Sequence, residues 1–327
     1  MDKPKLYPLQ FVPELKEKVW GGSKLQTILD KKSRDNSNHL GESWEISGVQ
    51  GTISKVSNGA LKGEEITQLI QKYTSDLVGE RVYQKYGDQF PLLFKFIDAE
   101  QDLSVQLHPN DALAQERHNA FGKTEMWYIL QAENDARLIL GFNKKLNKTT
   151  YAEILKTKKI TSVLHAEEVH QDEAYFIEPG LVHAIGAGVL LAEIQQTSDI
   201  TYRIYDWDRP DTDGTFRELH TKEALDAIQF TTTNPKITYT DLLNQRVLLV
   251  SCPYFVTHKL VVSENFNIEN FQNESCKVYM CTQGKAEFIT EDTSTTIQKG
   301  ETILIPACCT NYQIKTENAT FLEVYIP

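Results

Sequence analysis

Short runs of apolar and polar residues, separated by turn residues, dominate the chain. Such runs predict β-strands when they are rich in β-branched and aromatic residues and bounded by Gly, Pro, Asn or Asp. The clearest predicted strands are residues 92–97, 126–130, 137–140, 175–177 and 189–194. Helical patterns interrupt these strands at a few places and do not alternate with them regularly, which argues against a doubly wound α/β sheet.

A few segments have the spacing of an amphipathic helix. In the segment 64–73, the apolar residues Ile66, Leu69, Ile70 and Tyr73 share one helical face. The other predicted helices are residues 75–83, 150–155 and 221–228. We therefore expect small helical insertions, at about 60–87 and 149–165, in a mainly β protein.

The strand pattern of the middle of the chain recurs weakly near its end. Residues 127–130 and 136–139 have counterparts at 278–281 and 286–289. Both sets are typical of small antiparallel barrels, so we expect a mainly β fold of two cupin-like jelly-roll barrels with a small helical insertion. A polar, proline-containing stretch near 233–245 predicts the boundary between them. The expected domains are 1–240, with the helical insertions, and 241–327.

Four polar residues of the first predicted barrel form a candidate metal site. Gln106 and His108 are two residues apart, so in a strand their side chains point to the same face. Glu125 begins a later predicted strand, and His183 follows a turn. Two imidazoles, a carboxylate and a neutral amide oxygen suit Zn²⁺ or another divalent transition metal. The second barrel has no matching residues in its repeat, so we expect one metal, in the first barrel.

Composition and charge narrow the class of protein. The 327 residues include 34 Lys and Arg against 45 Asp and Glu, a net charge of −11, which is unfavourable for a nucleic-acid binder. We find no stretch of the roughly 20 apolar residues that a membrane helix needs, and no secretory signal pattern at the start. The 5 cysteines, an odd number, favour reduced thiols. We expect a cytoplasmic globular protein that binds neither nucleic acid nor membrane.

Several motifs resemble those of the type I mannose-6-phosphate isomerases (phosphomannose isomerases), in the short bacterial form, of the cupin superfamily. The strongest matches are SVQLHPND (104–111), GKTEMW (122–127), EPGLVHA (178–184) and EIQQTSDITYR (193–203). Weaker matches are VWGG (19–22), ESW (42–44) and FPLLFKFI (90–97). They follow the family's order and cover the first two thirds of the chain, while the tail matches by architecture alone.

The resemblance implies a zinc-dependent aldose–ketose isomerase that interconverts mannose 6-phosphate and fructose 6-phosphate through a cis-enediol. It implies one Zn²⁺ per chain and a phosphorylated hexose as substrate. The sequence has no Gly-rich phosphate loop of the nucleotide-binding kind, so we expect no nucleotide cofactor. The implied metal ligands are Gln106, His108, Glu125 and His183. The implied catalytic residues are Arg203, Lys123, Asp199 and Glu193. The implied substrate-binding residues are Ser104, Lys95 and Glu42.

The chain departs from the family pattern at Gly122, where longer members have a histidine, so a ring-opening role given to that histidine does not transfer. Other readings of single residues remain open. Lys95 interrupts an apolar run and is either a snorkelling lysine or a phosphate-binding cation. Arg203 either stabilises an enediolate charge or forms a structural ion pair with Asp199.

Two other functions stay open on the residues alone. One is a sugar-binding bicupin without catalysis, against which the intact set Lys123, Glu125, His183 and Arg203 argues. The other is a metal-dependent cupin oxygenase, which would use the two histidines and the carboxylate without Gln106. An isomerase assay with added metal, metal analysis and oxygen uptake would distinguish the three functions.

Overall fold

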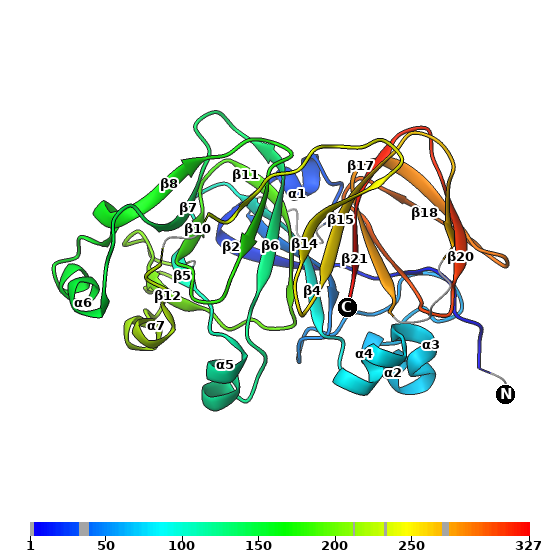
Figure 1. The fold of residues 1–327 in the computed structure, drawn as a ribbon, viewed down its shortest axis with the longest axis horizontal. Coiled ribbons are helices and arrows are strands. Elements are labelled where there is room, and N and C mark those ends of the chain that lie inside the picture. Colours follow the sequence, from blue (N-terminus) through cyan, green and yellow to red (C-terminus); the bar gives the residue numbers. More distant parts are fainter. Residues whose placement is uncertain (1–2, 33–38, 212, 232–233, 270–274) are drawn as a thin grey trace.

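Two β units lie side by side in the molecule, with helices α2 (Ile66–Tyr73) to α7 (Thr221–Ala227) along the lower edge of the view and α1 (Lys24–Thr27) between the units (Figure 1). The computed structural model describes residues 3–32, 39–211, 213–231, 234–269 and 275–327. The strands of these residues form a 7-stranded, a 5-stranded and a 9-stranded sheet. The prediction of a mainly β, cupin-like fold is confirmed, although the strands form open sheets and not closed barrels.

The first unit contains the 7-stranded and the 5-stranded sheet, in which neighbouring strands are antiparallel. In spatial order the larger sheet has β13 (Lys236–Ile237), β9 (Ala174–Ile177), β6 (Glu125–Ala132), β11 (Val189–Gln196), β4 (Leu92–Ala99), β2 (Glu14–Gly22) and β3 (Leu40–Ser47). The smaller sheet has β12 (Tyr202–Tyr205), β5 (Val105–Leu107), β10 (His183–Ile185), β7 (Arg137–Phe142) and β8 (Leu164–Glu168).

A hydrophobic core joins these two sheets. Trp127 and Leu191 of the larger sheet pack in one buried cluster with Leu138 and Ile185 of the smaller sheet. Every residue of β4 and β11 is buried, which explains why these strands read as nearly continuous apolar runs. The few charged residues in these strands are therefore buried, Lys95 and Glu193 on the face toward the smaller sheet and Asp98 on the opposite face, and a buried ion needs a partner.

The 9-stranded sheet contains the C-terminal strands and one N-terminal strand. Its main path is β1 (Leu9–Gln10), β19 (Thr302–Ile305), β17 (Lys277–Ile289), β21 (Ala319–Tyr325), β15 (Val256–Val262) and β14 (Arg246–Ser251). The remaining strands are β16 (Phe266–Glu269), β18 (Ser294–Gln298) and β20 (Asn311–Lys315). Residues 278–281 and 286–289 lie in the single strand β17, whereas their counterparts in the first unit lie in β6 and β7 of different sheets. The sequence repeat is thus local and does not extend to the whole geometry.

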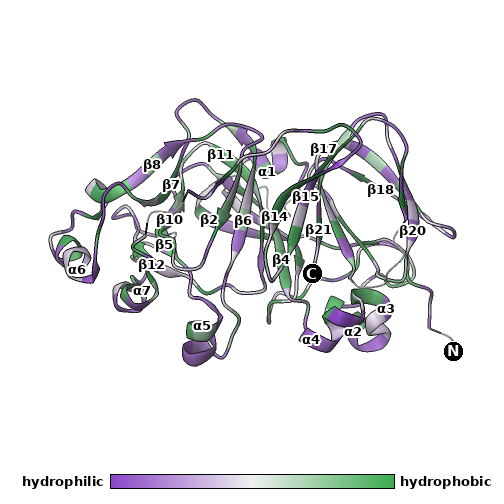
Figure 2. Ribbon diagram, viewed as in Figure 1, coloured by the Kyte–Doolittle hydropathy of each residue, from purple (hydrophilic) through white to green (hydrophobic). Residues whose placement is uncertain are grey.

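The helices are short and lie outside the sheets. They are α1 (Lys24–Thr27), α2 (Ile66–Tyr73), α3 (Ser75–Val78), α4 (Glu80–Tyr86), α5 (Asp111–His118), α6 (Lys148–Lys156), η1 (Ile160–Val163) and α7 (Thr221–Ala227). The helix predicted for residues 75–83 is split into α3 and α4 by Gly79, whose φ of 96° is in the region that glycine tolerates. Helix α5 was not predicted because its surface is largely polar (Figure 2) and Ala114 is its one buried residue. Its start is marked by Asn110, whose side chain accepts a hydrogen bond from Leu113 N.

The described helices include none that is both long and apolar enough to cross a membrane. All five cysteines are free thiols. Cys276 and Cys281 are buried, and burial raises the pKa of each thiol to about 12, so these two side chains act as small apolar core residues.

Asp98 of β4 is a carboxyl group with 0% solvent exposure close to the start of α1. Its Oδ2 accepts a hydrogen bond of 2.6 Å from Lys24 N. Its Oδ1 has no hydrogen-bond partner, and Lys24 Nζ lies 4.0 Å away. Burial raises the pKa of Asp98 to about 6, because the contacts with Lys24 offset only part of the desolvation, and Glu100 and Glu133 add repulsion.

We expect Asp98→Asn to raise the free energy of unfolding at pH 7.5 by about 2 kcal/mol. The pKa of Asp98 is higher in the native state than its usual 3.8, so the native state binds more protons there between pH 3.8 and about 6. Wild-type stability therefore falls as the pH rises through this window, and the amide removes that loss. Urea unfolding at pH 4.5, 6.0 and 7.5 measures the difference, which should shrink toward pH 4.5. A gap that is constant across these pH values would contradict the assignment.

Candidate metal centre

The register of the smaller sheet aligns three side chains that are far apart in the sequence. Gln106, in β5, is the antiparallel partner of His183 in β10 and of Arg203 in β12. Directly opposed residues in neighbouring strands project from the same face of a sheet. His183, Gln106 and Arg203 therefore form one row, and His108 follows one residue after the end of β5.

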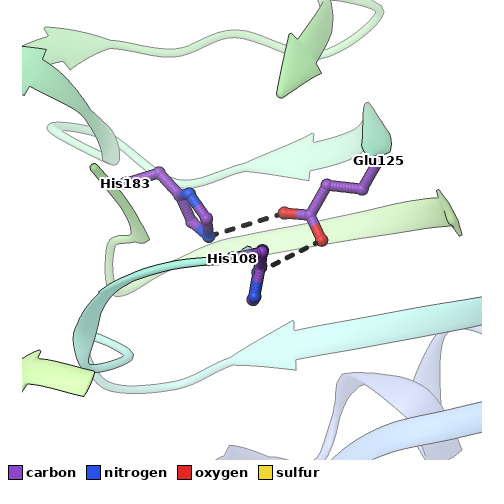
Figure 3. A group of neighbouring side chains, drawn as sticks. All are labelled: His108, Glu125 and His183. Atoms are coloured by element: carbon purple, nitrogen blue, oxygen red, sulfur yellow. Dashed lines mark ion pairs between the residues drawn. The ribbon is translucent and has the colours of Figure 1, made fainter. Parts of the chain in front are cut away.

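Two histidines and a glutamate meet at one end of this row. The ligand atoms of His108, Glu125 and His183 all lie within 4.8 Å of one another. His108 Nε2 is 3.5 Å from Glu125 Oε2, and His183 Nε2 is 3.5 Å from Glu125 Oε1. Figure 3 shows both imidazole rings directed at the carboxylate. All three side chains are at most 1% exposed, so water does not satisfy them.

Backbone carbonyls set the orientation of both imidazoles. His108 Nδ1 is 2.9 Å from Ile200 O, and His183 Nδ1 is 2.9 Å from Leu181 O. A carbonyl only accepts, so each Nδ1 carries the proton and each Nε2 presents a lone pair to the cluster. Both Nε2 atoms and both Glu125 oxygens are buried without a well-oriented hydrogen bond, and only Glu125 Oε2 has an ion-pair partner besides the histidines, Lys123 Nζ at 3.2 Å. Four such atoms are costly together unless a cation lies between them, so the residues fit a divalent metal.

The pKa values of the three side chains also favour a divalent metal at this cluster. Burial, reinforced by Lys123, holds the pKa of His108 well below its usual value. Burial also lowers the pKa of His183 to about 4, so both rings are neutral at neutral pH, as metal ligands must be. Burial raises the pKa of Glu125 to about 7, against the opposing effect of Lys123, whose Nζ lies 3.2 Å from Glu125 Oε2. Lys123 alone therefore does not offset the cost of burying the ionised Glu125 carboxylate, and a bound cation would supply the missing positive charge.

Gln106 is the neutral member of the predicted ligand set. Its place beside His183 in the register brings it to the cluster. Its Oε1 accepts a hydrogen bond of 3.1 Å from the Ser104 hydroxyl. Ser104 in turn accepts from Arg203 Nε at 3.3 Å, so the serine connects the amide to the guanidinium.

A second row of side chains lies on the larger sheet. Glu193, in β11, is the register partner of Lys95 in β4 and of Trp127 in β6. Lys95 Nζ is 2.8 Å from Glu193 Oε1, and Trp127 Nε1 donates to Glu193 Oε2 at 2.9 Å. Burial acts to raise the pKa of Glu193, but the lysines and the indole outweigh it and lower the pKa to about 2. A carboxylate held ionised in this way is a weak proton acceptor.

Glu42 of β3 lies next to this row. Its Oε2 accepts a hydrogen bond of 2.6 Å from Trp44 Nε1, and its Oε1 lies 3.4 Å from Lys18 Nζ. Lys95 Nζ lies 5.2 Å from the centroid of the Trp44 ring, a cation–π contact. Lys95 is therefore a buried, paired cation, and it does not extend to the solvent as a snorkelling lysine would.

A cavity of about 480 Å³ is lined by residues of both rows. The predicted site residues that line it are Glu42, Lys95, Ser104, Gln106, Lys123, His183, Glu193, Asp199 and Arg203. His108 and Glu125 lie in the buried cluster, whereas Asp199 is exposed. A cavity of this size and lining fits a polar molecule of hexose size.

The sequence reasoning missed several residues of the cavity wall. They are Lys16, Lys18, Trp20, Trp44, Thr52, Thr201 and Arg217, with apolar neighbours. Lys16, Lys18 and Trp20 alternate along β2, so a period of two was the available signal for them. Arg217 lies between β12 and α7 in a segment without periodicity, so its position depends on the tertiary structure.

Two guanidinium groups, of Arg203 and Arg217, line the cavity. Arg203 Nη1 donates to Glu218 O at 2.9 Å. Arg217 binds Asp206 through two donors, Nε at 2.7 Å and Nη2 at 2.6 Å. Burial lowers the pKa of Arg203, and repulsion from Arg217, which lines the same cavity, adds to the effect. Because the chain carries a net charge of −11, these cations form a local positive region on an acidic protein.

Comparisons with known proteins show the family to which this chain is similar. The family model "Phosphomannose isomerase type I, catalytic domain" matches residues 8–134, and "Mannose-6-phosphate isomerase, cupin domain" matches residues 245–326. The mannose-6-phosphate isomerase ManA of Bacillus subtilis is 35% identical over 305 residues, which is 91% of this chain and 93% of that protein. The mannose-6-phosphate isomerase of Streptococcus mutans is 30% identical over 308 residues, 94% of each chain. A crystal structure of the mannose 6-phosphate isomerase from Bacillus subtilis superposes with a TM-score of 0.87 at 30% identity, covering 97% of this chain and 99% of that one.

Proposed function

Because this chain belongs to the type I phosphomannose isomerases, we propose that it interconverts mannose 6-phosphate and fructose 6-phosphate. We further propose that one Zn²⁺ is held by Gln106, His108, Glu125 and His183. The observation that carries the proposal is the buried His–Glu–His cluster, whose four inward-facing atoms have no well-oriented hydrogen bond. The adjoining cavity of about 480 Å³, lined by charged groups of both signs, suits a phosphorylated hexose.

The reaction moves a carbonyl group between C1 and C2 of the sugar. A proton must leave one carbon and return to its neighbour, and the intermediate is a cis-enediol or its enediolate. When bound, the Zn²⁺ supplies Lewis acidity toward substrate oxygens. Arg203 stabilises the enediolate charge, because its guanidinium stays protonated and its contacts with Ser104 and Glu218 O hold it in one orientation.

The titratable residues of the cavity have different roles in this scheme. Glu193 is paired with Lys95 and Trp127, so it orients sugar hydroxyls as an acceptor and does not remove the carbon-bound proton. Lys123 is 5% exposed and its Nζ lies 3.2 Å from Glu125 Oε2, so we assign to its ammonium group the donation of a proton to a substrate oxygen. Asp199 lines the same cavity and is exposed, so we place it at the cavity entrance, where its carboxylate contacts the substrate.

The phosphate group of the substrate binds at the guanidinium end of the cavity. A phosphomonoester carries a charge of about −1.5 to −2 at neutral pH, so an acidic protein needs local cations to hold it. Arg217 is fixed by Asp206 through Nε and Nη2, which leaves donors on Nη1 for an anion.

We expect Arg217→Ala to raise KM for mannose 6-phosphate about tenfold and to change kcat less than about threefold. The reason is that a phosphate contact is made equally in the ground state and the transition state. Steady-state kinetics with both sugar phosphates, and inhibition by inorganic phosphate, measure the effect. Arg217→Lys should recover part of the affinity because it keeps the charge and loses the fork of donors. A fall in kcat at constant KM would place Arg217 in the chemical step instead.

The experiment that tests the function is an isomerase assay on the purified chain before and after metal loading. We expect fructose 6-phosphate to form from mannose 6-phosphate with Zn²⁺ bound at one ion per chain, without oxygen uptake. Sugar-phosphate binding without turnover would support the non-catalytic bicupin, and metal-dependent oxygen uptake would support the oxygenase. Either result would refute the isomerase.

We also propose that the chain divides into a catalytic unit, 1–240, and a C-terminal β unit, 241–327, without metal ligands, although β1 of the first segment pairs with β19 in the sheet of the second unit. We further propose that the enzyme acts in the cytoplasm. The separate family matches to 8–134 and 245–326 support this division. Within the described residues the candidate metal cluster belongs wholly to the first unit. Limited proteolysis followed by metal analysis of the fragments tests the division.

A further inference from the structure

One side chain of the C-terminal β unit ends beside the metal-binding segments. Tyr254, between β14 and β15, donates its hydroxyl to Asp111 Oδ2 at 2.5 Å. The next residue, Phe255, is 0% exposed in the hydrophobic core that joins both units. Lys85 of α4 donates to the carbonyl of Pro253 at 3.3 Å. The turn that carries Tyr254 is thus held on both sides, and its hydroxyl has a fixed position.

The other oxygen of Asp111 joins two further segments. Oδ1 accepts hydrogen bonds from Gly122 N at 2.9 Å and from Gln196 Nε2 at 2.9 Å. Gln196 in turn accepts from Thr124 N at 2.9 Å through its side chain and donates to Thr124 O at 3.1 Å through its backbone. One carboxylate therefore connects the segment after His108, the segment before Glu125 and the end of β11.

The segment before Glu125 depends on these hydrogen bonds. Residues 121–124 have no regular secondary structure, so no strand ladder sets their position. Besides the contacts of Asp111 and Gln196, the hydrogen bond from Lys123 N to Pro109 O at 3.1 Å holds them. Lys123 lies in this segment and Glu125 follows it directly, so a shift of the segment moves the lysine and the carboxylate together.

We propose that Asp111 is a positioning residue through which Tyr254 of the C-terminal unit holds Lys123 and Glu125 against the metal cluster. The inference rests on the metal site of the proposed function. It assigns to the C-terminal unit the positioning of two residues of that site. The hydrogen-bond partners that orient metal ligands contribute strongly to metal affinity. Asp111 acts one step further out, through the backbone at Gly122 and the side chain of Gln196.

Other contacts attach the two units to each other away from this point. Lys259 of β15 lies 3.9 Å from Asp172 Oδ1, and Ala307 N donates to Leu77 O at 2.9 Å. These contacts end at a turn before β9 and at α3. We therefore expect the two units to stay docked when the Tyr254 hydroxyl is removed. An effect of Tyr254→Phe on the metal site then reports the position of residues 121–125 and not a loss of general stability.

The test compares Asp111→Ala, Asp111→Asn and Tyr254→Phe with wild type. One readout is the rate at which the Zn²⁺-loaded protein loses its metal to a chromogenic chelator, and a second is hydrogen–deuterium exchange of residues 119–125 in the metal-free protein. We expect Asp111→Ala to speed metal loss about tenfold and Tyr254→Phe about threefold, with faster exchange in that segment. Asp111→Asn should stay close to wild type, because its oxygen can accept from Gly122 and Gln196 while its NH₂ group donates to the Tyr254 hydroxyl.

Tyr239→Phe is the matched control, because its hydroxyl donates to Asp172 O, away from the segment. We expect it to leave metal release and exchange of 119–125 unchanged. Wild-type behaviour of both Asp111→Ala and Tyr254→Phe, or equal effects of Tyr254→Phe and Tyr239→Phe, would overturn the proposal. Metal loss and exchange as fast in Asp111→Asn as in Asp111→Ala would also overturn it. If wild type neither binds Zn²⁺ nor isomerises, the proposed function fails, while the exchange measurement still tests the link.

Discussion

Glu125→Gln is expected to lower kcat/KM for mannose 6-phosphate by about 10³-fold or more and to remove most of the bound metal. Glu125 is the one charged member of the proposed ligand set, and both of its oxygens face an imidazole Nε2 at 3.5 Å. The amide keeps the volume and loses the negative charge. Lys123, whose Nζ lies 3.2 Å from the carboxylate, would then repel the cation without compensation.

Activity, metal content and thermal unfolding of Glu125→Gln should be measured together. Glu116→Gln, at an exposed position of α5, is the control for loss of one carboxylate and should behave as wild type. Treatment of wild type with a chelator is expected to reproduce the loss of activity, and Zn²⁺ should restore it. Full activity of the chelated protein would refute the metal-dependent mechanism. Full activity of Glu125→Gln with its metal bound would show that the Glu125 carboxylate is not an essential ligand.

Arg203→Ala is expected to lower kcat by about 10²- to 10³-fold while the metal stays bound. The guanidinium lies beside Gln106 in the sheet register and is oriented by Ser104 and by Glu218 O. Its loss leaves the enediolate charge without its fixed donors. Arg203→Lys should recover little, because an ammonium group does not reproduce the planar fork.

The kinetic patterns of the two arginines provide the control for this prediction. Arg203→Ala should act on kcat, whereas Arg217→Ala should act on KM, although both side chains line the same cavity. Metal analysis of each variant excludes an indirect effect through the ligands. Nearly unchanged turnover of Arg203→Ala with Zn²⁺ bound would show that its guanidinium does not stabilise the transition state.

Local patterns of apolar and polar residues were sufficient to predict many strands and helices of the fold. The β-branched and aromatic runs at 92–97 and 189–194 correspond to β4 and β11, and the apolar spacing at 64–73 corresponds to α2. These elements were predictable because their burial follows a period that is visible within a few residues. The helix α5 was not, because its residues are polar and its start depends on the cap at Asn110.

The candidate metal cluster was partly predictable. The ligand chemistry of His108, Glu125 and His183 is a property of residue types, and their grouping followed from strand positions and from the family motifs. The partners of the charged residues were not predictable. The ion pair of Lys95 with Glu193 depends on the register of β4 and β11, which are 98 residues apart at this pair.

The sequence by itself determined that the chain is mainly β, that its charges disfavour nucleic acid, and which side chains are suited to a divalent metal. Only the tertiary structure decided that the cluster is buried with both imidazole Nε2 atoms and Glu125 Oε1 lacking a hydrogen bond, that Glu193 is held ionised, and that Tyr254 reaches Asp111. The physical reason is that side-chain chemistry is local, whereas desolvation and pairing depend on neighbours that the sheet register brings from distant parts of the chain.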